Sequence, residues 1–141
     1  MNENPFVGTW ALVSFEVRRM NGVVSYPFGH HVRGYITYSQ EGYMSVSFMS
    51  VDRPNFQSND LRGGSVEEKV SAFDTYFSYC GKYEIRGEKV VHHIEVSLYP
   101  NWIGADQERF YTLDGDRLIL STPPVVFENS EQTGYLIWQR T

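Results

Sequence analysis

The chain begins and ends on tryptophan-centred segments in which apolar and polar residues alternate. Gly8-Thr9-Trp10 opens the first of these segments, and Trp138-Gln139-Arg140 closes the last one, one residue before the C-terminus. Alternation with a period of two is typical of β-strands that bury one face. A sheet whose first and last strands pair closes into an up-and-down barrel, which removes both sheet edges. We therefore predict this pairing, and a closed barrel can enclose a cavity.

Length and composition favour one compact domain over residues 1–141. A chain of 141 residues can bury a substantial core without disulfides or metals. Its single cysteine, Cys80, cannot form an intramolecular disulfide. Residues 1–5 lack the features of a secretory signal peptide, and no apolar run approaches the roughly 20 residues that span a bilayer. We therefore expect a cytoplasmic protein with no membrane partner.

Charge and aromatic content indicate the kind of partner. The net charge is −5 and no block of Lys and Arg occurs, which argues against nucleic acid. Ten tyrosines, nine phenylalanines and three tryptophans are spread along the chain. Tyrosine covers apolar surface while keeping a hydroxyl for hydrogen bonding. The expected partner is a small hydrophobic or aromatic molecule.

Strand-like segments separated by turn residues recur through the chain. We predict strands at residues 7–18, 23–26, 33–39, 43–49, 79–86, 89–98, 107–114, 117–122 and 133–140, with one more short strand within 123–132. In the first strand, one face is expected to carry Trp10, Leu12 and Ser14, and the other Ala11, Val13, Phe15 and Val17. The predicted fold class is all-β, an antiparallel up-and-down barrel of about 8–10 strands with room for a small ligand.

One helix is predicted, at about residues 66–78. Ser65 and Glu68 have the spacing of a capping box at its start. The apolar residues that follow recur at helical spacing: Val66, Val70, Phe73 and Phe77. The preceding residues 51–64 are rich in turn formers and read as a long loop. We expect the helix to cover one end of the barrel and, with the loop, to gate access to it.

Taken in order, several segments resemble the bacterial and fungal lipocalin-like domain family. They are residues 7–16, 34–38, 42–45, 79–84, 91–95, 100–104, 109–111 and 136–140. The resemblance implies a compact β-barrel, and some members look like accessory proteins of natural-product pathways. It also implies that a basic residue stacks on the first-strand tryptophan at the closed end, and Arg140 is the best-placed candidate. Unlike typical secreted lipocalins, this chain has one cysteine and places its helix mid-chain.

His92 is the first candidate for chemistry inside the barrel. On the strand at 89–98 it shares a face with four apolar residues: Val90, Ile94, Val96 and Leu98. Burial disfavours the charged imidazole, so an inward His92 could act as a base near neutral pH. The open alternatives are a structural histidine, a ligand contact and an acid or base in catalysis.

Arg109 is the second candidate, on the strand that follows. If Arg109 points inward, its guanidinium needs a carboxylate, tyrosine hydroxyls or an anionic ligand, because an unpaired buried charge is costly. Such a donor would hold a carboxylate or phenolate. The alternative is an external salt bridge or a cap over Trp10.

No metal or cofactor is predicted. Neighbouring strand residues point to opposite faces, so neither His30-His31 nor His92-His93 can chelate one ion. A site would need His93 and Glu95 together with a donor from elsewhere. No phosphate-cradling glycine loop or nucleotide fingerprint occurs. Cys80 reads as a buried structural cysteine in preference to a reactive thiolate.

The leading functional hypothesis is a barrel that binds a small, largely apolar ligand, aromatic or with an anionic group. The candidate ligand-binding residues are Tyr35, Tyr38, Met44, Tyr83, His92, Trp102, Arg109 and Tyr111. One alternative is a small-molecule cyclase or isomerase, with His92 as acid or base and Tyr83 or Arg109 stabilising negative charge. Another is a non-enzymatic partner-binding or oligomerisation module. The oligomeric state is left open, with a homodimer as one option.

Overall fold

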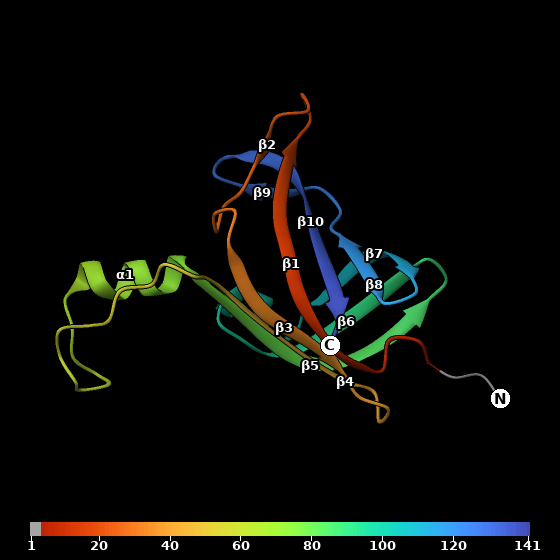
Figure 1. Cartoon of the computed structure of the whole chain (residues 1–141), viewed down its shortest axis with the longest axis horizontal. Coiled ribbons are helices and arrows are strands. Elements are labelled where there is room, and N and C mark those ends of the chain that lie inside the picture. The colour runs from red at the N-terminus through yellow and green to blue at the C-terminus, as the bar shows by residue number, and fades with distance from the viewer. Residues whose placement is uncertain (1–3) are drawn as a thin grey trace.

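Eight antiparallel strands form a closed barrel in the computed structural model, which describes residues 4–141 (Figure 1). The barrel strands are β1 (Gly8–Arg19), β3 (Val32–Tyr38), β4 (Tyr43–Ser50), β5 (Tyr76–Arg86), β6 (Lys89–Ser97), β7 (Asp106–Asp114), β8 (Arg117–Ser121) and β10 (Ser130–Arg140). Two short strands, β2 (Val24–Ser25) and β9 (Val125–Phe127), pair with β1 and β10. The predicted fold class is confirmed. Residues 1–3, part of the segment that led us to expect a cytoplasmic location, lie outside the described residues.

The barrel closes where β1 pairs with β10, as the two terminal tryptophans predict. Trp10 lies opposite Arg140 in this ladder, and Trp10 and Trp138 are both fully buried. The Arg140 guanidinium carbon lies 4.1 Å from the centroid of the Trp10 ring. Its Nη1 and Nη2 donate to the carbonyls of Val7 at 2.9 Å and Pro5 at 2.8 Å. Arg140 therefore takes the stacking position that the family resemblance implies.

Two β-bulges change which residues face inward. β1 has one between Leu12 and Ser14, after which Phe15 and Val17 turn toward the interior and Val13 is exposed. The predicted face assignment for this strand is therefore wrong beyond Leu12, because a bulge adds one residue and reverses the alternation.

The second bulge lies where β5 pairs with β6, between Cys80 and Gly81. A Cβ on Gly81 would lie 1.9 Å from the His93 carbonyl oxygen, so only glycine fits there. Past the bulge, Val96 is 63% exposed and no longer shares the inner face with His92. This corrects the predicted face assignment at that end of the strand.

The helix is shorter than predicted and does not cover the barrel. α1 spans Val66–Asp74 and begins with the predicted capping box between Ser65 and Glu68. Phe77 belongs instead to β5, where it pairs with Phe48 of β4. Figure 1 shows α1 and its preceding loop projecting away from the barrel, and none of the helix residues is buried. Because Phe77 pairs in β5, the apolar face of the helix is shorter than predicted. The expectation that the helix covers one end of the barrel is therefore wrong.

Arg53, in the loop that follows β4, is hydrogen-bonded to the end of the helix. Its Nε donates to Thr75 Oγ1 at 3.1 Å and its Nη2 to the Ala72 carbonyl at 3.0 Å.

Among residues 4–141, no helix is long and apolar enough to cross a membrane.

Removing the closing contact is expected to destabilise the barrel. Arg140→Met loses two charge-assisted hydrogen bonds and the contact with the Trp10 ring, so the free energy of unfolding should fall by about 2 kcal/mol. Urea denaturation monitored by tryptophan fluorescence measures this change. Arg117→Met, at an exposed position on the neighbouring strand β8, is the matched control and should cost less than about 0.5 kcal/mol. Equal losses in the two variants would contradict the role assigned to Arg140.

Candidate functional site

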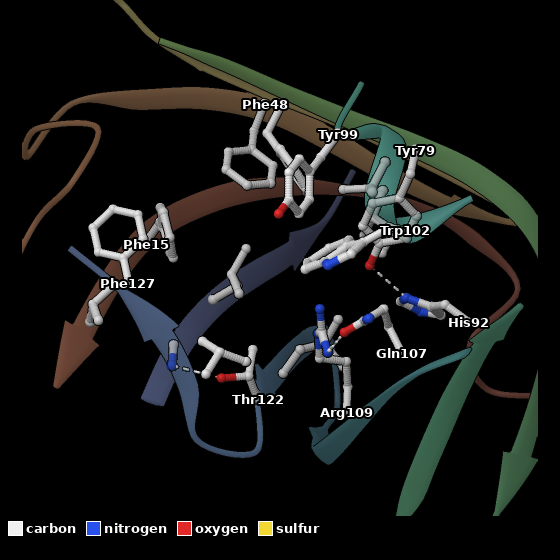
Figure 2. A pocket seen from close by; sticks show the side chains of 18 of the residues that line it. Phe15, Phe48, Tyr79, His92, Tyr99, Trp102, Gln107, Arg109, Thr122 and Phe127 are labelled. Atoms are coloured by element: carbon white, nitrogen blue, oxygen red, sulfur yellow. Dashed lines mark hydrogen bonds between the residues drawn. The ribbon is translucent and has the colours of Figure 1, made fainter. Parts of the chain in front are cut away.

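A cavity of about 590 Å³ lies inside the barrel (Figure 2). Its walls include residues of β9 and of the loop between β6 and β7, which place it toward the end of the barrel that carries β2 and β9. The opposite end is filled with side chains. There the buried Phe6 ring packs edge-on against Tyr38 and Tyr111, with centroids 5.1 and 4.9 Å apart. The volume falls within the roughly 300–1,000 Å³ range of small-molecule pockets.

Much of the cavity wall is aromatic. Trp102 packs edge-on against Phe77, Tyr79 and Tyr99, with ring centroids 5.3, 5.8 and 6.1 Å apart. A 3₁₀ turn, η1 (Pro100–Trp102), positions this tryptophan. Pro100 favours the start of such a turn because its ring fixes φ. Further rings come from the other strands and loops: Phe15, Phe28, Phe48 and Phe127.

Arg109 supplies the positive charge of the cavity. It lies on β7, is only 6% exposed, and points toward Trp102, whose ring centroid is 5.7 Å from the guanidinium carbon (Figure 2). Nη1 donates to Gln107 Oε1 at 3.3 Å and to the Glu108 backbone carbonyl at 2.9 Å. Both acceptors are uncharged. Among residues 4–141, no carboxylate oxygen lies within 4.0 Å of this guanidinium.

His92 is buried between two tyrosine hydroxyls. Its Nε2 lies 2.8 Å from Tyr38 Oη and its Nδ1 lies 2.8 Å from Tyr79 Oη. Burial lowers the pKa of His92 to about 3, and the nearby Arg109 and His93 act in the same direction. Burial also raises the pKa of both tyrosines. A neutral imidazole donates from one ring nitrogen and accepts at the other, so the two hydroxyls satisfy it completely.

Three of the eight predicted ligand-binding residues line the cavity: His92, Trp102 and Arg109. Four others pack in or beside the filled end of the barrel: Tyr38, Met44, Tyr83 and Tyr111. The eighth, Tyr35, lies on the outer face of β3 and is 49% exposed, because the inward positions of that strand belong to Ile36 and Tyr38. The expectation that these five residues line the cavity is corrected.

Several cavity residues were not predicted. Gln107 shares the inward face of β7 with Arg109, so strict alternation along that strand could have identified it. Tyr79 follows Phe77 on the inward face of β5, but the predicted helix ran over Phe77 and hid this pattern. Phe15 was hidden by the bulge in β1. The loop and β9 residues have no sequence pattern that would place them here.

His93 lies outside the barrel and has the opposite charge preference from His92. Its Nδ1 lies 2.6 Å from Asp106 Oδ1 and its Nε2 lies 2.7 Å from Glu84 Oε1. Hydrogen bonds to these two carboxylates raise the pKa of His93.

Within residues 4–141, no group of three His, Cys, Asp or Glu side chains is arranged to hold a metal ion. Cys80 is only partly buried.

Fold and site together define a cavity-bearing up-and-down β-barrel with an aromatic wall. The family model for the lipocalin-like domain matches residues 7–141, and the chain belongs to this family. A 4'-hydroxy-3'-methoxypropiophenone carrier protein of Aspergillus oryzae is 34% identical over 106 residues, covering 69% of this chain and 96% of that protein.

Two solved structures align with most of this chain. An uncharacterized protein from Bacteroides eggerthii has a TM-score of 0.47 at 15% identity, covering 95% of this chain and 98% of its own. A mutant of the fluorescent protein UnaG has a TM-score of 0.41 at 12% identity, covering 96% of each chain.

The two adjacent histidines should affect stability at different pH. The folded-state pKa of His92 lies below the unfolded value of about 6.5, so the unfolded chain takes up the proton first as the pH falls. Between about pH 6.5 and pH 3, this histidine should lower the free energy of unfolding by up to about 1.4 kcal/mol for each unit that the pH falls. Urea denaturation across this range should show a shallower loss in His92→Gln than in the unmodified protein.

His93→Gln is the control, because the raised pKa of His93 gives the opposite sign. His93 should add to the free energy of unfolding at low pH, and this stabilisation should be lost as the pH rises through its folded-state pKa. This variant should therefore keep the acid-side loss that His92 causes. Unchanged acid-side slopes in His92→Gln would contradict a buried neutral imidazole.

Proposed function

We propose that this protein binds a small, largely apolar aromatic molecule inside its barrel and carries it. The observation that supports this most directly is the cavity of about 590 Å³ whose wall carries aromatic rings from seven separate parts of the chain. An aromatic ligand in such a wall makes edge-to-face or stacked contacts in addition to burying apolar area. Three polar side chains at one side would orient it: Tyr79, Gln107 and Arg109.

The similarity to the Aspergillus oryzae protein supports the same proposal. That protein is described as a carrier of 4'-hydroxy-3'-methoxypropiophenone, a substituted aromatic ketone. The chain covers nearly all of it, at 34% identity. We propose a ligand of comparable chemistry here, with an aromatic ring and a few oxygen substituents.

The site gives less support to the cyclase or isomerase alternative. A general base works best when its pKa lies near the operating pH, whereas burial lowers the pKa of His92 to about 3. Both ring nitrogens also lie within hydrogen-bond distance of tyrosine hydroxyls, so neither is free to meet a substrate. His92 fits better as a neutral group that fixes the position of Tyr79 in the cavity wall.

The cavity also bears on the alternative of a pure partner-binding module. Such a module has no need of interior space, and unfilled space in a core costs stability. A cavity of about 590 Å³ is large compared with the roughly 30 Å³ that one water molecule occupies. The retained space favours a ligand-binding role.

A larger side chain inside the cavity should weaken ligand binding without unfolding the barrel. Gly134 lines the cavity, and a Cβ there would meet its nearest neighbour, Thr122 Cγ2, at 3.4 Å. Gly134→Leu should therefore fit and weaken the binding of 4'-hydroxy-3'-methoxypropiophenone by at least about tenfold, since the leucine takes up ligand space. Quenching of tryptophan fluorescence measures the affinity, because Trp102 and Trp138 line the cavity.

The matched control is Thr112→Leu, which adds a leucine at an exposed position on β7. It should leave the affinity unchanged. Equal affinity of Gly134→Leu and the unmodified protein would place the ligand outside the barrel and sink the proposal.

A further inference from the structure

The charge inside the cavity is unbalanced. Of the twenty-one residues that line it, Arg109 is the only one that carries a charge, and none is an aspartate or glutamate. The nearby Glu108 offers its backbone carbonyl to the guanidinium, while its side chain pairs with Lys89 at 3.3 Å. The cavity therefore holds one buried cation with no counter-ion among the described residues.

The neighbouring titratable groups do not supply the missing negative charge. Tyr79 of β5 and Tyr38 of β3 stay protonated, since burial raises the pKa of each hydroxyl. His92 of β6 is neutral, and His93 points outward to its own two carboxylates. Gln107 offers only an amide oxygen. Every group facing the guanidinium is thus uncharged near neutral pH.

Ligand binding makes this imbalance more important. In the open cavity, water can solvate the guanidinium, but a ligand that fills the space displaces that water. A neutral ligand would leave the cation dry and unpaired, which is strongly unfavourable. A ligand with an oxyanion would instead form short charge-assisted hydrogen bonds to it.

We infer that the ligand occupies the cavity as an aromatic monoanion, with its oxyanion against the Arg109 guanidinium and its ring within the aromatic wall. This inference rests on the proposed function and specifies the charge state of its ligand. Two kinds of compound carry such an oxyanion, an aromatic carboxylate and an acidic phenol. A phenol with an acyl group in the para position is acidic because its anion spreads charge onto the carbonyl oxygen.

A neutral phenol must lose its proton to bind in this form. The O–H bond breaks, the electron pair stays on the phenol oxygen, and the proton passes to the buffer. The Arg109 charge stabilises the resulting phenolate. Binding should therefore lower the apparent pKa of the phenol and release protons.

Three matched compounds test the inference: 4'-hydroxy-3'-methoxypropiophenone, its methyl ether 3',4'-dimethoxypropiophenone, and 3,4-dimethoxybenzoate. At about pH 6, where the free phenol keeps its proton, the phenol should show a phenolate absorption band when the unmodified protein is added. It should also bind at least about tenfold tighter than the methyl ether. The carboxylate should show the same advantage over the ether.

Arg109→Gln should abolish the phenolate band and bring the affinities for the phenol and its methyl ether to within about twofold of each other. Arg109→Lys, which keeps the charge, should retain the band. The absorbance titration of the unmodified protein tests the inference even if the variants fold poorly.

The outcomes separate this inference from the proposed function. Binding of the phenol and its ether with equal affinity and no phenolate band, together with no preference for the carboxylate, would overturn the inference and leave the proposed function standing. A carboxylate preference without a phenolate band supports it, with carboxylic acids as the ligand class. If none of the three compounds bound, both proposals would fall.

Discussion

The structure depends on the pairing of β1 with β10, because without it the sheet would be open and the cavity would not exist. Trp10 and Trp138 are buried beside this seam, and Arg140 covers the Trp10 ring while binding two carbonyls of the N-terminal segment. Closure satisfies both sheet edges by backbone hydrogen bonds. Packed side chains around Phe6 fill one end of the closed barrel. The other end is left free to hold space.

Two irregularities in the strands then determine what faces that space. The bulge in β1 turns Phe15 and Val17 inward. The bulge opposite Gly81 leaves Ile94 on the inner face of β6 with His92 and turns Val96 outward. Both bulges are local, but each reverses the facing of every residue beyond it. The aromatic wall is therefore a product of strand register as much as of composition.

The polar side of the cavity is governed by burial. Its imidazole and its tyrosine hydroxyls are kept neutral and hydrogen-bonded to one another, whereas its guanidinium keeps its charge and finds only uncharged acceptors. Groups that can lose their charge do so in a low-dielectric interior, and arginine cannot. This difference makes Arg109 the electrostatic centre of the site. The rest of the wall contributes shape and apolar contact.

The sequence by itself determined the fold class, the strand segments, the closing pair of strands and the capping box of the helix, and it marked His92 and Arg109 as candidates for the interior. These follow from local alternation and spacing, which a single strand or turn displays. The tertiary structure alone decided the two bulges, the outward projection of α1, and which tyrosines line the cavity. Tyr38 and Tyr79 both face inward, yet only Tyr79 reaches open space, because Phe6 packs against Tyr38 at the filled end. These features depend on contacts between residues that are distant in the chain, and the periodicity of a single segment cannot predict such contacts.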